Sequence, residues 1–308
     1  MKTILFIVML FFQFSYSQTA IVPSCYQIDE KLSKDLYKIV LELEHNFDVG
    51  EDGIEQISFG VIDLTGEQPK LGGVNYDNFI YPASVYKMYV AAEILQQVSQ
   101  RKYSLYQSYI AKEPNVVDRS KQIDNDPRPL LKDGDTVTIN YLLDLMITRS
   151  DNSAANCLID MAQRRNIDSL LHSYDWFGSE VTRKFLKRKF EDPGYENIRG
   201  TETCALHAAD FMYKIYSNTL VNELVSYQMK TLLGRQIDKS KLAAGLPNSA
   251  MFYHKTGWFS YWTNDVGIVL DGKVKYIIAC FIPLDEELAL PKFKVLSQKV
   301  YELIKNRN

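Results

Sequence analysis

Residues 148–156 read Thr-Arg-Ser-Asp-Asn-Ser-Ala-Ala-Asn and place the tripeptide Ser150-Asp151-Asn152 just before an apparent helix of the 308-residue chain. Two further motifs lie far from it, Ser84-Val85-Tyr86-Lys87 before it and Lys255-Thr256-Gly257 after it. By chance, a chain of this length and average composition contains about one Ser-x-x-Lys. Ser-Asp-Asn and Lys-Thr-Gly would each occur by chance in only about one chain in twenty. Their joint occurrence in this order therefore indicates one constellation, which the fold must bring together.

The residue types of this constellation suit acyl transfer by a serine. A serine hydroxyl is a weak nucleophile and needs a base, and the four histidines of the chain form no apparent triad. Ser84 is predicted at a helix start, where free N–H groups favour an oxyanion, with Lys87 one turn later on the same face. Burial and a second cation, Lys255, can lower the pKa of a lysine, and Ser150 can relay a proton.

Each motif also has a purely structural explanation. Ser84 or Asn152 can cap a helix, Lys87 can be a surface lysine, and Lys255 can protect an edge strand. Thr256 and its strand backbone can, in the functional interpretation, hold a substrate carboxylate or amide by directional hydrogen bonds. The structural explanations do not predict that the motifs occur together.

Hydrophobic periodicity predicts the elements that carry the motifs. It indicates a helix over 26–46, a strand over 55–64, another strand in the 70s and a mostly helical region over 84–200. Thr138 precedes a helical run as its N-cap. Two strands at 264–270 and 274–282 flank Asp271-Gly272, a strong hairpin signal, and a last helix is expected over 291–306.

This order of elements predicts an α/β (α+β) fold, with an antiparallel sheet built from both chain ends and flanked by helices, and an inserted all-helical lobe. We expect a signal peptide at 1–17 and a single catalytic domain at 18–308. The α/β lobe is expected at about 26–83 and 205–308, and the helical lobe at about 84–204.

The three motifs resemble those of the class A β-lactamases and their relatives, the penicillin-recognising serine hydrolases. Residues 129–139, 145–156 and 263–267 also look like segments of that family. The similarity extends over roughly residues 30–306 and implies a β-lactamase/transpeptidase-like fold, in agreement with the two lobes predicted above.

The resemblance implies how the chemistry is divided. Ser84 would be acylated by the substrate carbonyl, Lys87 would act as a base or within a proton relay, and Ser150 would carry a proton to the leaving nitrogen. The oxyanion hole would consist of the backbone N–H groups of Ser84 and of Trp258, the residue after Gly257. Such donors stabilise the transition state by about 2.7–4 kcal/mol each.

The resemblance also implies a substrate site. Asn152 would hydrogen-bond the substrate amide, and Lys255 and Thr256 would hold its carboxylate. The partner would be a small-molecule β-lactam or a cell-wall peptide, and no metal or organic cofactor is implied.

One family feature is absent from the sequence. In class A β-lactamases a glutamate within Glu-x-x-Leu-Asn activates the deacylating water, and this pattern does not occur in residues 188–201. Glu191 is the nearest candidate for the base, and Glu196-Asn197 is another. Acylation of Ser84 is therefore better supported than rapid turnover.

The N-terminus predicts export. Lys2 precedes a short apolar run at 4–12, and small residues lead to a cleavage site after Ser17, as in secretory signal peptides. The run is shorter than the roughly 20 residues that span a bilayer, so we expect a periplasmic or secreted protein with no membrane span after cleavage. With 35 basic and 38 acidic residues, the chain has no surplus of positive charge to neutralise phosphates, so nucleic-acid binding is not expected. We also expect a monomer.

Export makes disulfides possible. Cys157 and Cys280 look like buried small hydrophobes, whereas the context of Cys25 and Cys204 fixes no pairing.

Residues 183–189 contain five cations in seven positions. They predict either a solvated helix face beside Phe185 and Leu186 or a contact for an anionic cell-envelope polymer.

Three functions are thus left open: a β-lactamase, an enzyme acting on cell-wall peptides or another ester or amide, and a non-catalytic envelope module. The intact motifs argue against the last.

Overall fold

The computed structural model describes residues 20–43, 56–119, 126–185 and 200–307. The expected signal peptide at 1–17 and the candidate base Glu191 lie outside these residues.

The described chain is organised on a six-stranded sheet in the order β1-β3-β2-β8-β7-β6. All neighbours pair antiparallel except β1 and β3, so strands from the two chain ends form one sheet, as predicted. In the joining pair, Val61 lies opposite Ile278. The strands are β1 (Gln27–Ile28), β2 (Ser58–Asp63), β3 (Lys70–Val74), β6 (Met251–Phe259), β7 (Trp262–Asp271) and β8 (Val274–Ile282).

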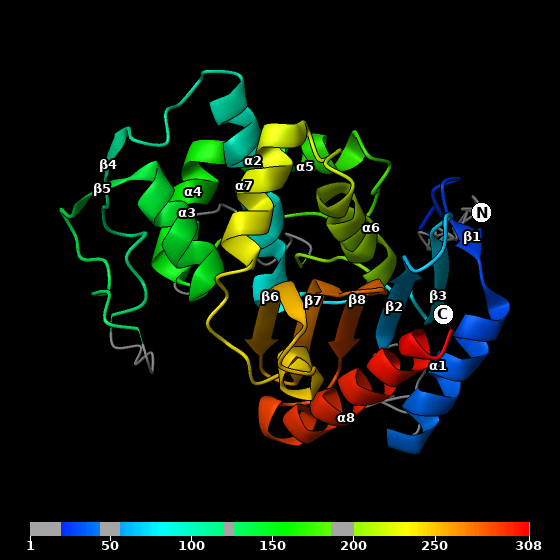
Figure 1. The fold of residues 1–308 in the computed structure, drawn as a ribbon. Helices are drawn as coiled ribbons and strands as arrows, with labels where there is room; N and C mark the ends of the chain where they lie inside the picture. The colour runs from blue at the N-terminus through cyan, green and yellow to red at the C-terminus, as the bar shows by residue number, and fades with distance from the viewer. Residues whose placement is uncertain (1–19, 44–55, 120–125, 186–199, 308) are drawn as a thin grey trace, which may run out of the picture.

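Helices cover both faces of this sheet (Figure 1). The terminal helices α1 (Glu30–Leu43) and α8 (Glu286–Lys305) lie on one face, and α6 (Ala205–Tyr216) lies on the other. The apolar stripe of α1 is buried as its periodicity predicts, at Leu32, Leu36, Ile39 and Val40. This packing leaves the opposite face of the sheet to the helices that carry the motifs.

Three local predictions are confirmed, the last of them with a different boundary. The β7–β8 hairpin turns at Gly272, whose φ of 58° suits glycine, and Thr138 caps the next helix by accepting a hydrogen bond from the Tyr141 amide. Helix α8, however, begins five residues before the predicted start at residue 291. Pro291 favours a first turn, but Asp285 caps the helix earlier and the proline lies inside it.

The motif-bearing helices pack around α2 (Lys87–Ser99), which is buried almost all round. The region also contains a two-stranded sheet of β4 (Ser108–Ile110) and β5 (Thr136–Thr138), which the mostly helical prediction for 84–200 missed. Three-residue strands are too short to show a period. The surrounding helices are α3 (Ile139–Thr148), α4 (Asn152–Ala162), α5 (Arg164–His172) and α7 (Glu223–Leu233).

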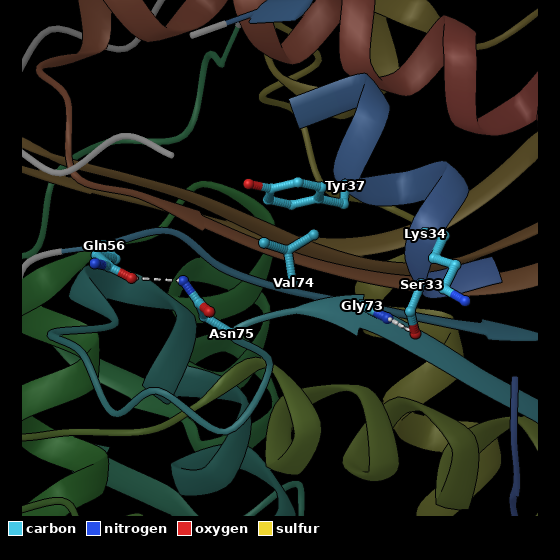
Figure 2. A pocket seen from close by; sticks show the side chains of 7 residues that line it. All are labelled: Ser33, Lys34, Tyr37, Gln56, Gly73, Val74 and Asn75. Atoms are coloured by element: carbon cyan, nitrogen blue, oxygen red, sulfur yellow. Dashed lines mark hydrogen bonds between the residues drawn. The ribbon is translucent and has the colours of Figure 1, made fainter. Parts of the chain in front are cut away.

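Helix α1 lies directly on the backbone of β3. Figure 2 shows the groove at their junction, of about 470 Å³, where the Gly73 amide donates to the Ser33 hydroxyl at 3.2 Å. A Cβ atom at Gly72 would come within 2.7 Å of Leu32 Cγ, so glycine is required there by close approach.

A buried polar chain joins α2 to α6. His207 Nδ1 lies 2.9 Å from the Ser179 hydroxyl, which is 2.8 Å from Thr203 Oγ1, and the latter is 2.9 Å from the Tyr89 hydroxyl. Burial lowers the pKa of His207 from 6.5 to about 4. The folded state therefore holds this imidazole neutral.

No described helix is long and apolar enough to cross a membrane. Among the described residues no disulfide links the four cysteines. Cys157, Cys204 and Cys280 are buried, and Cys25 is exposed.

We expect Gly72→Ala to lower the free energy of unfolding by about 1–3 kcal/mol, because the new methyl group overpacks the contact with Leu32. Gly66→Ala is the matched control, since its Cβ would meet nothing closer than 3.9 Å. Urea titration of both variants measures the difference, and equal midpoints would contradict this account.

Because His207 has a lower pKa folded than unfolded, the unfolded state binds the extra proton between pH 6.5 and about 4. Stability from this group is present above pH 6.5 and is lost as the pH falls through that window, by up to about 3 kcal/mol. Thermal unfolding of the wild type and of His207→Gln from pH 7 to pH 4 should show a shallower decline in the variant. Parallel curves would exclude this role.

Candidate active site

Ser84 lies in a 3₁₀ turn, η1 (Ala83–Tyr86), that leads straight into α2 at Lys87. The turn begins at Ala83 with a φ of 47°, in the left-handed region that non-glycine residues rarely adopt. Gly257 of β6 lies against this turn, because a Cβ atom there would be 2.9 Å from the Ser84 amide nitrogen. The backbone that leads to Trp258 therefore passes directly beside the predicted nucleophile.

The Lys87 side chain is fully buried and points at the second motif. Its ammonium donates to the Ser150 carbonyl at 2.7 Å, to the Ser150 hydroxyl at 3.1 Å and to Asn152 Oδ1 at 2.8 Å. The first helix turn after the nucleophile is thereby tied to the Ser-Asp-Asn motif.

Lys255, also fully buried, reaches the same hydroxyl from β6. Its Nζ donates to Ser150 Oγ at 3.1 Å and to the Thr256 carbonyl at 2.7 Å. Ser150 has a φ of 60°, which holds it in a left-handed turn between α3 and α4. A hydroxyl that accepts from two ammonium groups keeps its own proton for donation, as a proton relay requires.

The Ser-Asp-Asn segment is held by charged groups that the sequence analysis did not identify. Asp118 accepts from the Asn152 amide at 2.6 Å and from Asn152 Nδ2 at 2.9 Å. Asp151 caps α4 and pairs with the buried Arg149 at 2.8 Å. Nothing in the local sequence around Asp118 signals this role, since the contact spans 34 positions.

Phe185 also contacts the site. Its ring centroid is 4.2 Å from Lys87 Nζ, and the ring stacks on Tyr86 with centroids 4.8 Å apart. Asn156 fixes the backbone, accepting from the Phe185 amide at 2.8 Å and donating to its carbonyl at 3.0 Å. The prediction of a solvated helix face is wrong for the described part of that stretch, 183–185, which is not helical. The aromatic ring gains more by packing on Tyr86 and Lys87 than by facing water.

These groups border a cleft of about 1060 Å³ between the helices and β6. Its wall combines hydroxyl, amide and backbone groups of the three motifs with aromatic side chains. Of the predicted site residues, those that line it are Ser84, Ser150, Asn152, Thr256, Gly257 and Trp258. Lys87 and Lys255 reach it through Ser150, and Glu191 lies outside the described residues.

A further cation, Lys241, lines the cleft and was missed by sequence analysis. It donates to Asp238 at 2.8 Å and to Glu286 at 2.6 Å. Burial disfavours its charged form, but the two carboxylates outweigh burial and raise the pKa of Lys241.

The chain is similar in sequence to known β-lactamases. The model of the Beta-lactamase enzyme family matches residues 42–303. A β-lactamase of Bacteroides uniformis is 30% identical over 217 residues, which is 65% of this chain and 69% of that protein. The extended-spectrum β-lactamase PER-1 of Pseudomonas aeruginosa is 27% identical over 237 residues, 70% of this chain and 71% of the relative.

Solved structures show the same fold. PBP-A superposes with a TM-score of 0.74 at 17% identity, covering 93% of this chain and all of PBP-A. A mutant of PBP-A, solved as an acyl-enzyme complex with penicillin G, superposes with a TM-score of 0.73 at 17% identity. The match covers 91% of this chain and 98% of the mutant's chain. The chain thus belongs to the β-lactamase enzyme family and is a serine hydrolase of the β-lactamase type.

Proposed function

We propose that this protein is exported and opens β-lactam amides through an acyl-serine intermediate at Ser84. The observation that carries the proposal is the Ser150 hydroxyl, which accepts from Lys87 and Lys255 at 3.1 Å each beside the Ser84 turn. The cleft thereby contains a nucleophile, a path for its proton and a cation that can bind the substrate.

The proposed acylation is balanced by groups of this chain. Ser84 Oγ attacks the lactam carbonyl carbon, and the carbon–nitrogen bond of the ring breaks. Lys87, acting as the neutral amine, takes the Ser84 proton, and Ser150 gives its own proton to the leaving nitrogen and regains one from Lys87. The opened product stays attached as an ester. The backbone amides of Ser84 and Trp258 stabilise the oxyanion.

Substrate binding is proposed on the remaining motif residues. Lys255 and Thr256 hold the substrate carboxylate, and Asn152 faces its amide. Asn152 is held between Lys87 and Asp118 in this structure, so its side chain is preorganised before substrate arrives.

A second candidate, acyl transfer on cell-wall peptides, uses the same acylation. The observation in its favour is that the Glu-x-x-Leu-Asn pattern, whose glutamate activates the deacylating water in class A β-lactamases, is absent from residues 188–201. The two candidates differ in how long the acyl group stays on Ser84.

We expect the wild-type protein either to carry a covalent penicillin G adduct or to turn over a chromogenic cephalosporin, and Ser84→Ala to do neither, because the variant lacks the attacking oxygen. Intact-protein mass spectrometry after mixing gives the adduct mass, and a chromogenic cephalosporin followed in parallel gives the turnover. Circular dichroism confirms that the variant is folded. An adduct that survives in Ser84→Ala would remove Ser84 from the mechanism.

We expect Gly257→Ala to slow acylation by about 10²–10³-fold, the typical loss of one oxyanion-hole donor. Its methyl group would lie 2.8 Å from the Pro82 carbonyl oxygen and 2.9 Å from the Ser84 nitrogen. Because these distances are too short, the methyl group must push β6 away from the turn that carries Ser84. Stopped-flow measurement of the acylation rate provides the test, with Gly66→Ala as the glycine control. An unchanged rate would refute the assignment of the oxyanion hole.

A further inference from the structure

The side-chain amide of Asn152 lies between a carboxylate and an ammonium group. Its Nδ2 donates to Asp118 Oδ1 at 2.9 Å, and its Oδ1 accepts from Lys87 Nζ at 2.8 Å. A carboxylate only accepts hydrogen bonds and an ammonium only donates them, so the two ends of the amide cannot exchange places. The amide therefore has one orientation, in which its oxygen faces Lys87 and its nitrogen faces Asp118.

Asp118 is itself held in place and is only 5% exposed. Its second oxygen, Oδ2, accepts from the backbone amide of Asn152, the first residue of α4, at 2.6 Å. The Ser153 hydroxyl accepts from the backbone amides of Val117 and Asp118 at 2.9 and 3.0 Å, which binds the same segment to α4. The carboxylate is thus fixed by the helix whose first side chain it orients.

Lys87 does not maintain this orientation through the whole reaction. In the acylation proposed above it acts as a neutral amine, whose nitrogen can accept a hydrogen bond as well as donate one. Both ends of the Asn152 amide would then suit Lys87. Of the described partners of this amide, the Asp118 carboxylate alone still distinguishes its nitrogen from its oxygen.

The orientation decides what the amide offers to a substrate. The amide nitrogen carries two hydrogens, and Asp118 accepts one of them. Asn152 lines the same cleft as Ser84, so the second hydrogen is a donor for a bound substrate. In the reversed orientation the amide would present its oxygen there, which repels a carbonyl oxygen of the substrate.

We propose that Asp118 is a positioning residue that makes the site select β-lactams with an acylamino group, by fixing the Asn152 amide with its second N–H toward the cleft. This inference rests on the acylation of Ser84 proposed above. The acyl carbonyl oxygen of penicillin G accepts that hydrogen bond while the lactam carbonyl lies at Ser84. The penicillin nucleus with a free amine at the same position has no such oxygen and gains nothing from the orientation.

The test compares acylation by these two compounds, penicillin G and the penicillin nucleus with a free amine. Acylation is measured as kcat/KM, or as the rate of adduct formation where the adduct persists, so the result does not depend on how fast the acyl group is released. We expect the wild type to prefer penicillin G by at least about tenfold, and Asp118→Asn to reduce that preference at least about fivefold, as for a hydrogen bond left unmade.

Two controls separate positioning from a loss of structure, and circular dichroism shows whether each variant is folded. Asp29→Asn removes a carboxylate that accepts from the Leu32 amide at 2.8 Å beside the start of α1, on the other face of the sheet, and should keep the wild-type preference. In an Asn152→Ala background, Asp118→Asn should no longer change the preference, because Asp118 acts through that amide.

A merely structural role would slow both substrates equally, so an unchanged preference in folded Asp118→Asn overturns the proposal. A further loss of preference in the Asn152→Ala background also overturns it. If Asp118→Asn does not fold, Asp118→Glu replaces it with the same expectation and the same refutation, since it keeps the charge but displaces the carboxylate by one methylene. Absence of acylation by both compounds in the wild type would instead refute the proposed function, and this inference with it.

Discussion

The architecture of the site depends on one oxygen atom, Ser150 Oγ, which accepts hydrogen bonds from two buried ammonium groups. Lys87 comes from the central helix α2 and Lys255 from the strand β6, so this hydroxyl joins the helices to the sheet. Buried charges are costly unless they are well bonded, which constrains the positions of both elements. The three motifs, far apart in sequence, meet because each supplies one side of this contact.

Supporting groups keep that contact in place. Asp118 holds Asn152, the Arg149–Asp151 pair holds the start of α4, and Gly257 lets β6 approach the Ser84 turn. Backbone strain at Ala83 and Ser150 is concentrated at the same point, which is where functional sites commonly carry it. The rest of the fold, with α1 and α8 on the far face of the sheet, supplies the rigidity that maintains this geometry.

Local rules predicted the elements whose signals are short in range. The Gly272 hairpin, the Thr138 cap and the apolar stripe of α1 each follow from a few neighbouring residues. The site residues were placed by the three motifs together. Phe185 was misjudged because the surrounding cations dominate its local pattern, while its partners Tyr86, Lys87 and Asn156 are distant in sequence. Contacts such as Asp118 with Asn152 arise only from the tertiary fold and have no local signature.

The burial of Lys87 has a consequence for how this protein can change. Helix α2 is buried on almost every side, and apolar residues in place of both Lys87 and the polar side chains that bind it would avoid the cost of hiding an ammonium group. Selection for thermal stability alone would therefore favour loss of the site, since proteins often carry activity at the expense of stability. A stable descendant that retains the two-lobed shape while lacking this lysine would be an inert scaffold, and shape alone would not reveal the difference.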